Sequence, residues 1–467
     1  MGRTALFMII VFNITFMFMG FQLSTAASSA YEKYCGYADI EQASLALESA
    51  SNIAINNALM CAPCTADTFL ASNASFGKAT FTIKMHPMVT SAGAQDGDSI
   101  IITGTYPLTG SIASSLTCTT GVRVKGNSFA QYVFYSQSEK DGNGNPINWT
   151  TGDTCRGRYH TQDNITTNGK AVFMGKVTMK GTINSSGTAP VFYQTPTHAD
   201  VSIPQSFTDL NTLANNGGRV VTTLNTYVQF NADGTVTVRT GSNGWTENRS
   251  QMNGNPNNTI PMCTTYASIT ALASSGVFLV QDAELHIKGT LSAPLGSFAN
   301  ITLGCVDKVK GSGLSNVYID DNLTYQYPPP TVRTPNPVPH TANTMLGIVA
   351  SNNILVSQYQ NHNTDTKTQV ELKNVTINAS IFSQTDGFGA ENYDGRGNDG
   401  KLTVVGGIQQ ATRQPVGQGS GSNIKGFLKD YDYDNNLNTQ SPNGYPKTAF
   451  VVLDWVDQMN IPASFYY

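Results

Sequence analysis

The pattern of apolar and polar positions divides the chain into a helical N-terminus and a longer β-rich remainder. No charged side chain occurs over residues 4–31, and most side chains there are large and apolar. Charges then return, and apolar residues recur at helical spacing as far as Leu59 without an intervening proline. The pattern predicts one helix over residues 1–60, apolar over 4–30 and amphipathic over 31–60.

From about residue 70 the pattern changes to short runs rich in β-branched residues, separated by glycine, asparagine and aspartate. Runs at 79–84, 99–103 and 131–135 predict strands of an antiparallel region. Later runs, such as 346–356 and 370–379, alternate apolar and polar residues and recur roughly every 25–35 residues, as stacked repeats do. Each such repeat can bury its apolar face only by stacking on its neighbours, which predicts an irregular parallel β-helix, or solenoid. A β-sandwich is the alternative.

These patterns predict a mainly β protein with one long N-terminal α-helix. The length of 467 residues suffices for two or three domains, or for one long repetitive domain. We expect four parts: an N-terminal helix at 1–60, a β-rich subdomain at 61–150, a β-helix-like body at 151–425 and a C-terminal closing segment at 426–467.

The composition narrows the classes of function. Charged residues form 12% of the chain, about half the usual share, and the net charge is −4. Asparagine, glycine, threonine and serine take their place, which is typical of an extracellular β-rich protein. No run of lysine or arginine offers a surface that could follow a phosphate backbone. The composition therefore argues against a nucleic-acid binder and against a cytosolic enzyme.

The seven cysteines are too widely scattered for a zinc site, because Cys61 and Cys64 form the only closely spaced pair. In an exported protein the natural expectation is two or three disulfides. The expected pairs are Cys118 with Cys155 and Cys263 with Cys305, and Cys61 with Cys64 is a weaker candidate.

Three interpretations account for the apolar N-terminus. A cleaved signal peptide would have an apolar core followed by small residues at its cleavage site, and residues 24–30 supply such residues. An uncleaved anchor needs about 20 apolar residues, and residues 5–27 reach that length. The third interpretation is a long helix that is apolar in its first half and amphipathic in its second. Signal peptides are not normally followed by about thirty residues of helix in phase, so residues 31–60 favour the third; a plain anchor is the alternative.

This layout resembles the N-terminal half of type IV pilins and the related pseudopilins. In that family the apolar half lies in the membrane before assembly and then packs with its neighbours as the core of a filament. The resemblance implies that copies of this chain contact one another through the same segment. The residues assigned to the assembly surface are Ala5, Leu6, Phe7, Ile9, Ile10, Val11, Phe12, Asn13, Phe16, Phe18 and Phe21.

One position departs from the pilin pattern. Pilins usually carry a glutamate at the fifth mature position, after a glycine at the leader cleavage site. Here the fifth residue is Phe7 if the leader ends at Gly2, and Ala5 if Met1 is the mature start. The carboxylate that would pair with a neighbour's terminal amine is missing. We therefore expect the register between copies to come from apolar packing, with Asn13 as a polar marker.

A second resemblance lies in the body. Residues 152–178, which contain Gly157-Arg-Tyr-His160, look like a motif of uncharacterised bacterial surface proteins that also begin with a pilin-like helix. Further segments that fit the same pattern are 346–350, 402–417 and 426–434. That family brings no established activity with it.

Candidate catalytic residues are few. His160 lies near Asp163, but neither a nucleophile elbow nor a catalytic cysteine context accompanies them, so a role in a turn is expected. Asp320–Asp321 and residues 430–434 are the densest acidic groups, of the kind that serve glycoside cleavage or calcium binding. The segment 430–434 departs from a calcium loop at the sixth and twelfth positions. We therefore expect no enzymatic activity, cofactor or metal.

Together these patterns predict a structural subunit of an extracellular bacterial filament at the cell surface, with a membrane-inserted precursor. Its expected partners are copies of itself, the inner membrane before assembly, and surface glycans as a candidate ligand class. The alternatives are a membrane-anchored β-helix that binds or cleaves carbohydrate, and a minor pilin or adhesin.

Overall fold

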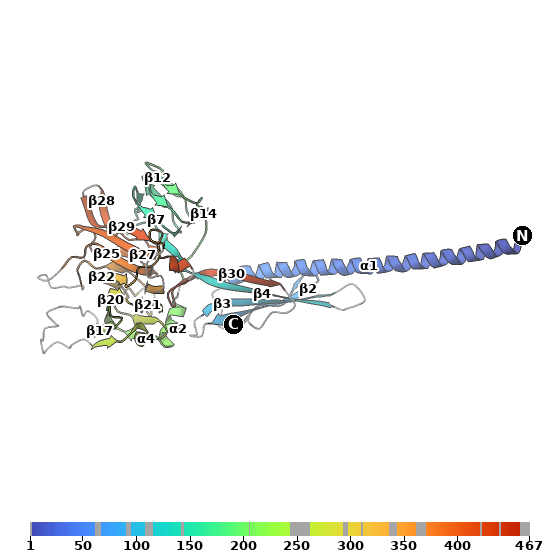
Figure 1. Cartoon of the computed structure of the whole chain (residues 1–467), viewed down its shortest axis with the longest axis horizontal. Helices are drawn as coiled ribbons and strands as arrows, with labels where there is room; N and C mark the ends of the chain where they lie inside the picture. Colours follow the sequence, from blue (N-terminus) through green and yellow to red (C-terminus); the bar gives the residue numbers. More distant parts are fainter. Residues whose placement is uncertain are drawn as a thin grey trace. The chain divides into compact units, whose positions relative to one another are not determined.

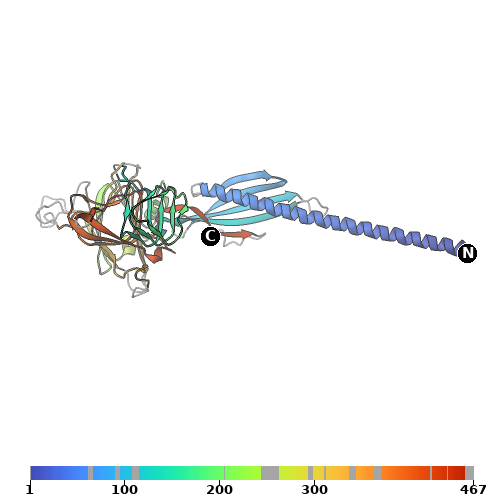
Figure 2. The ribbon, with the colours of Figure 1, turned by 90° about the horizontal axis from the view of Figure 1, so that it is seen from above.

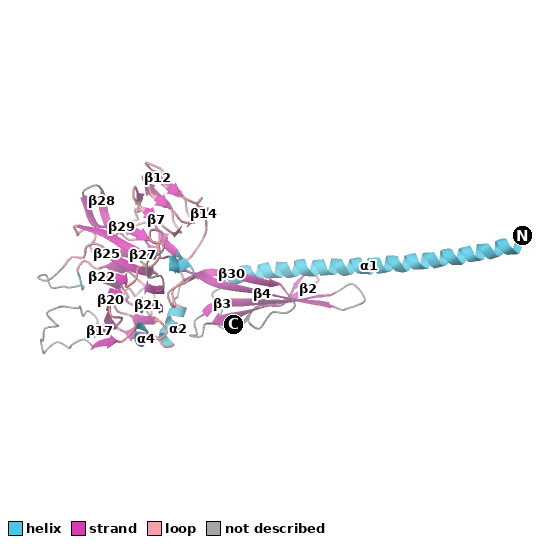
Figure 3. Ribbon diagram, viewed as in Figure 1, coloured by secondary structure: helices cyan, strands magenta, loops and turns pink. Residues whose placement is uncertain are grey.

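The computed structural model describes residues 2–60, 67–89, 95–107, 115–141, 144–204, 206–242, 262–292, 298–309, 312–335, 343–360, 370–420, 423–438 and 440–457. Strands predominate, and one long helix begins the chain (Figures 1 and 3), which confirms the predicted fold class. The chain divides into two compact units. The sheet unit comprises Met1–Val89, Gln95–Gly126 and Ala449–Tyr467, and the stacked unit consists chiefly of Asn127–Thr448.

The sheet unit contains the helix α1 (Gly2–Met60) and a five-stranded sheet. The strands of this sheet are β1 Thr68–Phe76, β2 Ala79–Val89, β3 Gln95–Pro107, β4 Ser115–Ser128 and β30 Lys447–Asp457. Strands β1 to β4 form consecutive antiparallel hairpins, and β30 joins the sheet beside β4. The residues between β4 and β30, which form the stacked unit, are therefore an insertion into this sheet. Residues 426–467 are predicted only as a closing segment, and their last strand, β30, belongs to this sheet.

The second half of α1 lies along the sheet (Figure 2), and a row of alanines makes the contact. Ala43, Ala46, Ala50 and Ala54 are three or four positions apart and share one helix face, and each is at most 7% exposed. Their small side chains allow the helix backbone to approach the sheet closely. The residues that pack against them come from alternate positions of β2, β3 and β4, and include Phe81, Ile83, Met85, Ile100, Ile102, Val122 and Val124.

In the stacked unit, residues 149–198 form a coil with three short strands in each turn. These strands are β6 Trp149–Thr150, β7 Thr154–Cys155, β8 Arg158–Thr161, β9 Ile165–Asn168, β10 Val172–Phe173, β11 Val177–Met179, β12 Ile183–Ser186, β13 Val191–Phe192 and β14 Thr197–His198. Ile165 pairs in parallel with Ile183, so this turn repeats after 18 residues. Position 175 requires a glycine, because a Cβ there would lie 2.1 Å from the carbonyl oxygen of Gly157 on the previous turn.

The rest of the stacked unit has longer strands, most of which also pair in parallel. Its elements are η1 Phe129–Gln131, β5 Tyr132–Ser138, α2 Thr208–Asn215, β15 Arg219–Thr222, β16 Leu224–Phe230, β17 Val236–Ser242, β18 Met262–Tyr266, α4 Ile269–Leu272, β19 Val277–Gln281, β20 Leu285–Leu291, β21 Phe298–Val306, β22 Val317–Tyr325, β23 Asn343–Ala350, β24 Ile354–Val356, β25 Val375–Ser383, β26 Phe388–Ala390, β27 Asn398–Thr412, β28 Gly417–Ser420, β29 Asn423–Asp432 and η3 Asn435–Asn438. Leu285, Val317, Ile354 and Phe388 align on successive coils and are at most 2% exposed. Each such burial contributes about 1.5–3 kcal/mol, so the aligned side chains form a continuous core.

One parallel sheet runs through the stacked unit in the order β15-β19-β21-β23-β25-β27-β5-β8-β11-β14. The chain enters this sheet near its middle at β5 and runs outward to β14. It resumes at the other end with β15 and returns to β27, beside β5. The two ends of the insertion meet, because the backbone N–H of Phe129 donates to the carbonyl oxygen of Pro446 at 2.9 Å.

The predicted disulfides Cys118–Cys155 and Cys263–Cys305 are wrong, because Cys155, Cys263 and Cys305 carry free thiols. Cys155 and Cys305 are buried inside the stack, where they pack as small apolar side chains. Burial raises the pKa of the Cys155 thiol to about 12. Cys263 is exposed on β18. Cys61 and Cys64 lie outside the described residues.

Candidate functional site: the exposed apolar helix

The first half of α1 exposes apolar side chains on every side. Residues 2–34 are all exposed, and Phe12, Phe16 and Phe18 are 65%, 60% and 65% exposed. Leaving such a side chain in water forgoes about 1.5–3 kcal/mol compared with burying it. A contiguous apolar surface of this extent is the mark of a membrane or protein contact.

All residues assigned to the assembly surface, from Ala5 to Phe21, lie on this exposed half. Phe7, Val11, Phe12 and Phe16 border one shallow groove along the helix, and the ring centroids of Phe12 and Phe16 lie 4.8 Å apart. The contacts that other copies would make with these side chains stay a prediction.

Two of the polar side chains in this half have hydrogen-bond partners within the helix, which makes them compatible with an apolar environment. Thr15 donates its hydroxyl to the carbonyl oxygen of Val11 at 2.8 Å, and Thr25 donates to that of Phe21 at 2.9 Å.

Within the described residues, α1 is the one helix long and apolar enough to cross a bilayer, with a mean hydropathy of 2.1 over its most apolar 18 residues.

The exposed apolar segment ends in a band of tyrosines. Tyr31, Tyr34 and Tyr37 are 69%, 71% and 74% exposed, and the charged residues Glu32 and Lys33 lie between the first two. Tyrosine favours the boundary between membrane and water, where its ring meets hydrocarbon and its hydroxyl meets water. The change from apolar to polar surface along α1 therefore falls at residues 31–37.

His160, which the sequence analysis singles out, is part of the packing inside the stack. Its Nδ1 lies 2.7 Å from the hydroxyl of Thr178 on the next turn, and its ring stacks on Tyr135 with centroids 5.3 Å apart. Burial lowers the pKa of His160 to about 4, so the ring is neutral at physiological pH. Asp163 instead accepts the backbone N–H of Glu139 at 3.2 Å. His160 and Asp163 thus hold neighbouring segments of the stack together.

The acidic groups named in the sequence analysis make separate contacts. Arg333 binds both Asp430 and Asp432, with its Nη1 3.1 Å from Asp430 and its Nε 3.3 Å from Asp432. Asp320 pairs with His286 at 3.0 Å. Within the described residues, no group of three or more His, Cys, Asp or Glu side chains could hold a metal ion. That the chain is not an enzyme stays a prediction.

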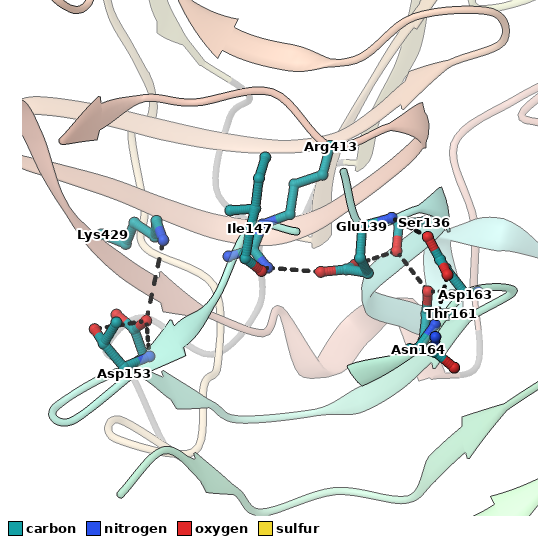
Figure 4. Close-up of polar contacts among 10 residues, drawn as sticks. Ser136, Glu139, Ile147, Asp153, Thr161, Asp163, Asn164, Arg413 and Lys429 are labelled. Atoms are coloured by element: carbon teal, nitrogen blue, oxygen red, sulfur yellow. Dashed lines mark hydrogen bonds and ion pairs between the residues drawn. The ribbon is translucent and has the colours of Figure 1, made fainter. Parts of the chain in front are cut away.

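A buried ion pair that the sequence does not predict joins the ends of the paired strands β27 and β5 (Figure 4). Arg413, directly after β27, donates to Glu139, directly after β5, at 2.6 Å, and the two side chains are 3% and 1% exposed. Glu139 also accepts the hydroxyl of Ser136. Because Arg413 and Glu139 are 274 residues apart, no local pattern indicates that they meet.

Lys429 and Asp153 extend this charged cluster (Figure 4). The Lys429 Nζ lies 4.0 Å from Asp153, and the Arg413 guanidinium lies 4.5 Å from the ring of Trp149. Burial, and then the charge of Arg413, lower the pKa of Lys429 to about 8. The cluster lies where β27 pairs with β5, and we interpret it as the contact that fixes this junction.

Comparison with known proteins gives one distant structural likeness and no sequence match. No known protein family matches the sequence, and no curated protein matches it. Among solved structures, the chain is similar to the competence-associated pilin ComZ from Thermus thermophilus, with 10% identity and a TM-score of 0.29 over 90% of this chain and 98% of that chain. A likeness at this level carries no conclusion about activity or partners.

Proposed function

We propose that this chain is a structural subunit of an extracellular bacterial filament, assembled by packing the first half of α1 against the same segment of other copies. The supporting observation is that residues 2–34 are exposed and mostly apolar on every side, whereas the second half of the same helix is fixed to the sheet. A helix that is apolar all round is stable inside a membrane or among other helices. The membrane would hold the precursor, and the filament core would hold the assembled subunit.

The free energy of burial is large enough to drive this assembly. The exposed large apolar side chains between Leu6 and Leu23 would together gain on the order of 20 kcal/mol or more on burial. Association costs roughly 4–15 kcal/mol in lost translational and rotational freedom. Burial among copies therefore outweighs the cost of association once the helix leaves lipid.

Two features of the segment suit helix packing better than a plain membrane anchor. At 1.5 Å per residue, the uncharged residues 4–31 extend for about 42 Å, which exceeds the hydrocarbon core of a bilayer, roughly 30 Å thick. Residues 24–30 are all serine, threonine or alanine, and such small side chains let neighbouring helices approach closely. A plain anchor requires neither feature.

Material sheared from the cell surface tests the proposal. We expect electron microscopy to show filaments, and sequencing to show that their subunits retain the apolar residues 5–27. A major subunit should also dominate the filament protein, whereas a minor pilin or adhesin should be present in few copies. Recovery of the chain only as detached monomers, or only without residues 1–27, would overturn the proposal.

Two variants separate assembly from membrane insertion. Phe12→Arg places a charge in the apolar segment and should abolish both, because a buried charge is costly in lipid and in a filament core. Ala27→Leu keeps the segment apolar, so insertion should persist while the added bulk prevents close helix contact. The matched control Val309→Arg changes a 73% exposed residue of the stacked unit and should leave filaments intact. Normal filaments from Ala27→Leu would show that assembly does not need close helix contact at Ala27, whereas membrane insertion of the parent chain without filaments would favour the plain anchor.

A further inference from the structure

A groove of about 600 Å³ lies in the stacked unit, on residues that the proposed assembly does not use. It is bordered by the turn between β16 and β17, by the segment around α4, and by residues after β22 and before β30. Its volume is within the range of roughly 300–1,000 Å³ that small-ligand sites occupy. Its lining includes the side chains of Asp233, Ser292, Asn300, Gln326, Tyr327 and Asn443.

Two amide side chains in the groove are held in place by the surrounding backbone. The Asn300 Oδ1 accepts the backbone N–H of Asn443 at 2.9 Å, and the Asn300 Nδ2 donates to the carbonyl oxygen of Ser441 at 3.1 Å. The Asn443 Nδ2 donates to the carbonyl oxygen of Ser275 at 3.2 Å. Polar groups that are already oriented lose little entropy when a ligand binds.

Two further polar groups are oriented by neighbouring residues. The Gln326 Oε1 accepts a hydrogen bond from the hydroxyl of Ser292, which fixes the orientation of the amide. The NH₂ group of the same amide can then donate to a ligand. The Asp233 Oδ1 accepts the backbone N–H of Thr235 at 2.9 Å and its hydroxyl at 2.7 Å. These hydrogen bonds lower the pKa of Asp233, so the groove carries a carboxylate at neutral pH.

The groove also has an aromatic ring and a single negative charge in its described lining. Tyr327 contributes a half-buried aromatic ring to the lining. Among the described lining residues, Asp233 is the one charged side chain, and no lysine, arginine or histidine is present. A ligand with a phosphate, sulfate or carboxylate group would meet repulsion from Asp233 and no compensating cation.

We propose that this groove binds a neutral oligosaccharide. Sugar hydroxyls are both donors and acceptors, and they match the oriented amides of Asn300 and Gln326 and the Asp233 carboxylate. The apolar C–H face of a pyranose ring can pack on the ring of Tyr327, as other flat apolar surfaces pack on aromatic rings. This activity does not rest on filament assembly, because the groove lies entirely within the stacked unit.

Saturation-transfer NMR on the full chain in a zwitterionic detergent without sugar headgroups tests this inference. The probes are neutral trisaccharides of glucose, galactose, mannose and N-acetylglucosamine, with sialyllactose as the anionic comparison. We expect at least one neutral trisaccharide to bind with a Kd of about 1 mM or lower, and sialyllactose to bind at least tenfold more weakly. No binding of any neutral probe at about 10 mM, or preference for the anionic probe, would overturn the inference.

Substitutions locate the binding. Tyr327→Ala should weaken binding at least tenfold, whereas Tyr193→Ala, which removes another tyrosine of the stacked unit that is 64% exposed, should leave it unchanged. Gln326→Ala changes an exposed residue and should also weaken binding without lowering the melting temperature. It serves as the test if Tyr327→Ala fails to fold. Equal binding by both groove variants and the parent chain would place any sugar site elsewhere and refute the assignment.

Discussion

The first half of α1 and the stacked unit differ in which side chains they expose and which they bury. The helix exposes large apolar side chains such as Phe12 and Phe18, whereas the stacked unit buries charged side chains such as Arg413 and Glu139. The buried charges find their partners within the chain, so the stacked unit supplies its own stability. The exposed helix gains its stability from lipid or from other copies. Stability and assembly thus belong to separate regions, and each should change without the other.

The largest expected effect within the chain comes from breaking the buried ion pair. Arg413→Met leaves the Glu139 carboxylate buried without its cation, which should lower the free energy of unfolding by about 3–5 kcal/mol. Urea unfolding followed by tryptophan fluorescence measures this loss, because Trp149 lies beside Arg413. Subunits of this variant that do fold should still assemble.

A double variant provides the control for this prediction. Glu139→Met combined with Arg413→Met removes both charges, and it should recover most of the lost stability because an apolar pair can replace a buried ion pair. A double variant as unstable as Arg413→Met would show that the charge pair is not what fixes the junction. Loss of assembly in folded Arg413→Met subunits would contradict the separation of stability from assembly.

The helix could be predicted from the sequence because its signal is local. Residues 4–31 have no charge, and nothing between there and Leu59 interrupts the helical spacing. The exposed positions of Phe7 to Phe21 follow directly, since a segment apolar on every side cannot bury itself against one sheet. The structure adds the row of alanines, such as Ala46 and Ala50, that fixes the second half of α1 to the sheet.

The stacking order could not be predicted because its contacts are distant in sequence. Ile408 pairs with Phe134, and the sequence contains no pattern that links the two. The 18-residue repeat around Ile165 is carried by a few side chains and by Gly175, which is too little to reveal it. The disulfide prediction failed for a related reason: Cys155 is buried as a packing residue, and cysteine spacing does not distinguish that from pairing.

Asp434 allows the stability of the stacked unit to be changed by pH alone. Burial raises the pKa of this carboxyl to about 7, although the backbone N–H of Asn436 donates to it at 2.9 Å. Between about pH 4 and 7, Asp434 holds a proton in the folded chain and releases it in the unfolded chain. The free energy of unfolding therefore falls as pH rises, by about 1.4 kcal/mol per pH unit. Asp434→Asn stays neutral and should exceed the parent by roughly 2–4 kcal/mol at pH 8 but match it near pH 4.

Urea unfolding of parent and variant across this pH range checks the prediction. Asp432→Asn is the comparison, because it removes the contact with Arg333 at 3.3 Å and should be no more stable than the parent at any pH. A constant difference between Asp434→Asn and the parent from pH 4 to 8 would show that the carboxyl does not titrate as expected. Filament assembly should be unaffected by either change.

The smallest expected effect concerns the polar position on the exposed helix. If Asn13 sets the register between copies, Asn13→Leu should still assemble, because the apolar surface remains, but it should lose a contact of about 0.6–2 kcal/mol per subunit. Electron microscopy should then show filaments with more than one helical rise. Thr15→Val is the matched control, since the Thr15 hydroxyl already donates to Val11 within its own helix at 2.8 Å. A single, unchanged rise in Asn13→Leu filaments would mean that apolar packing alone determines the register.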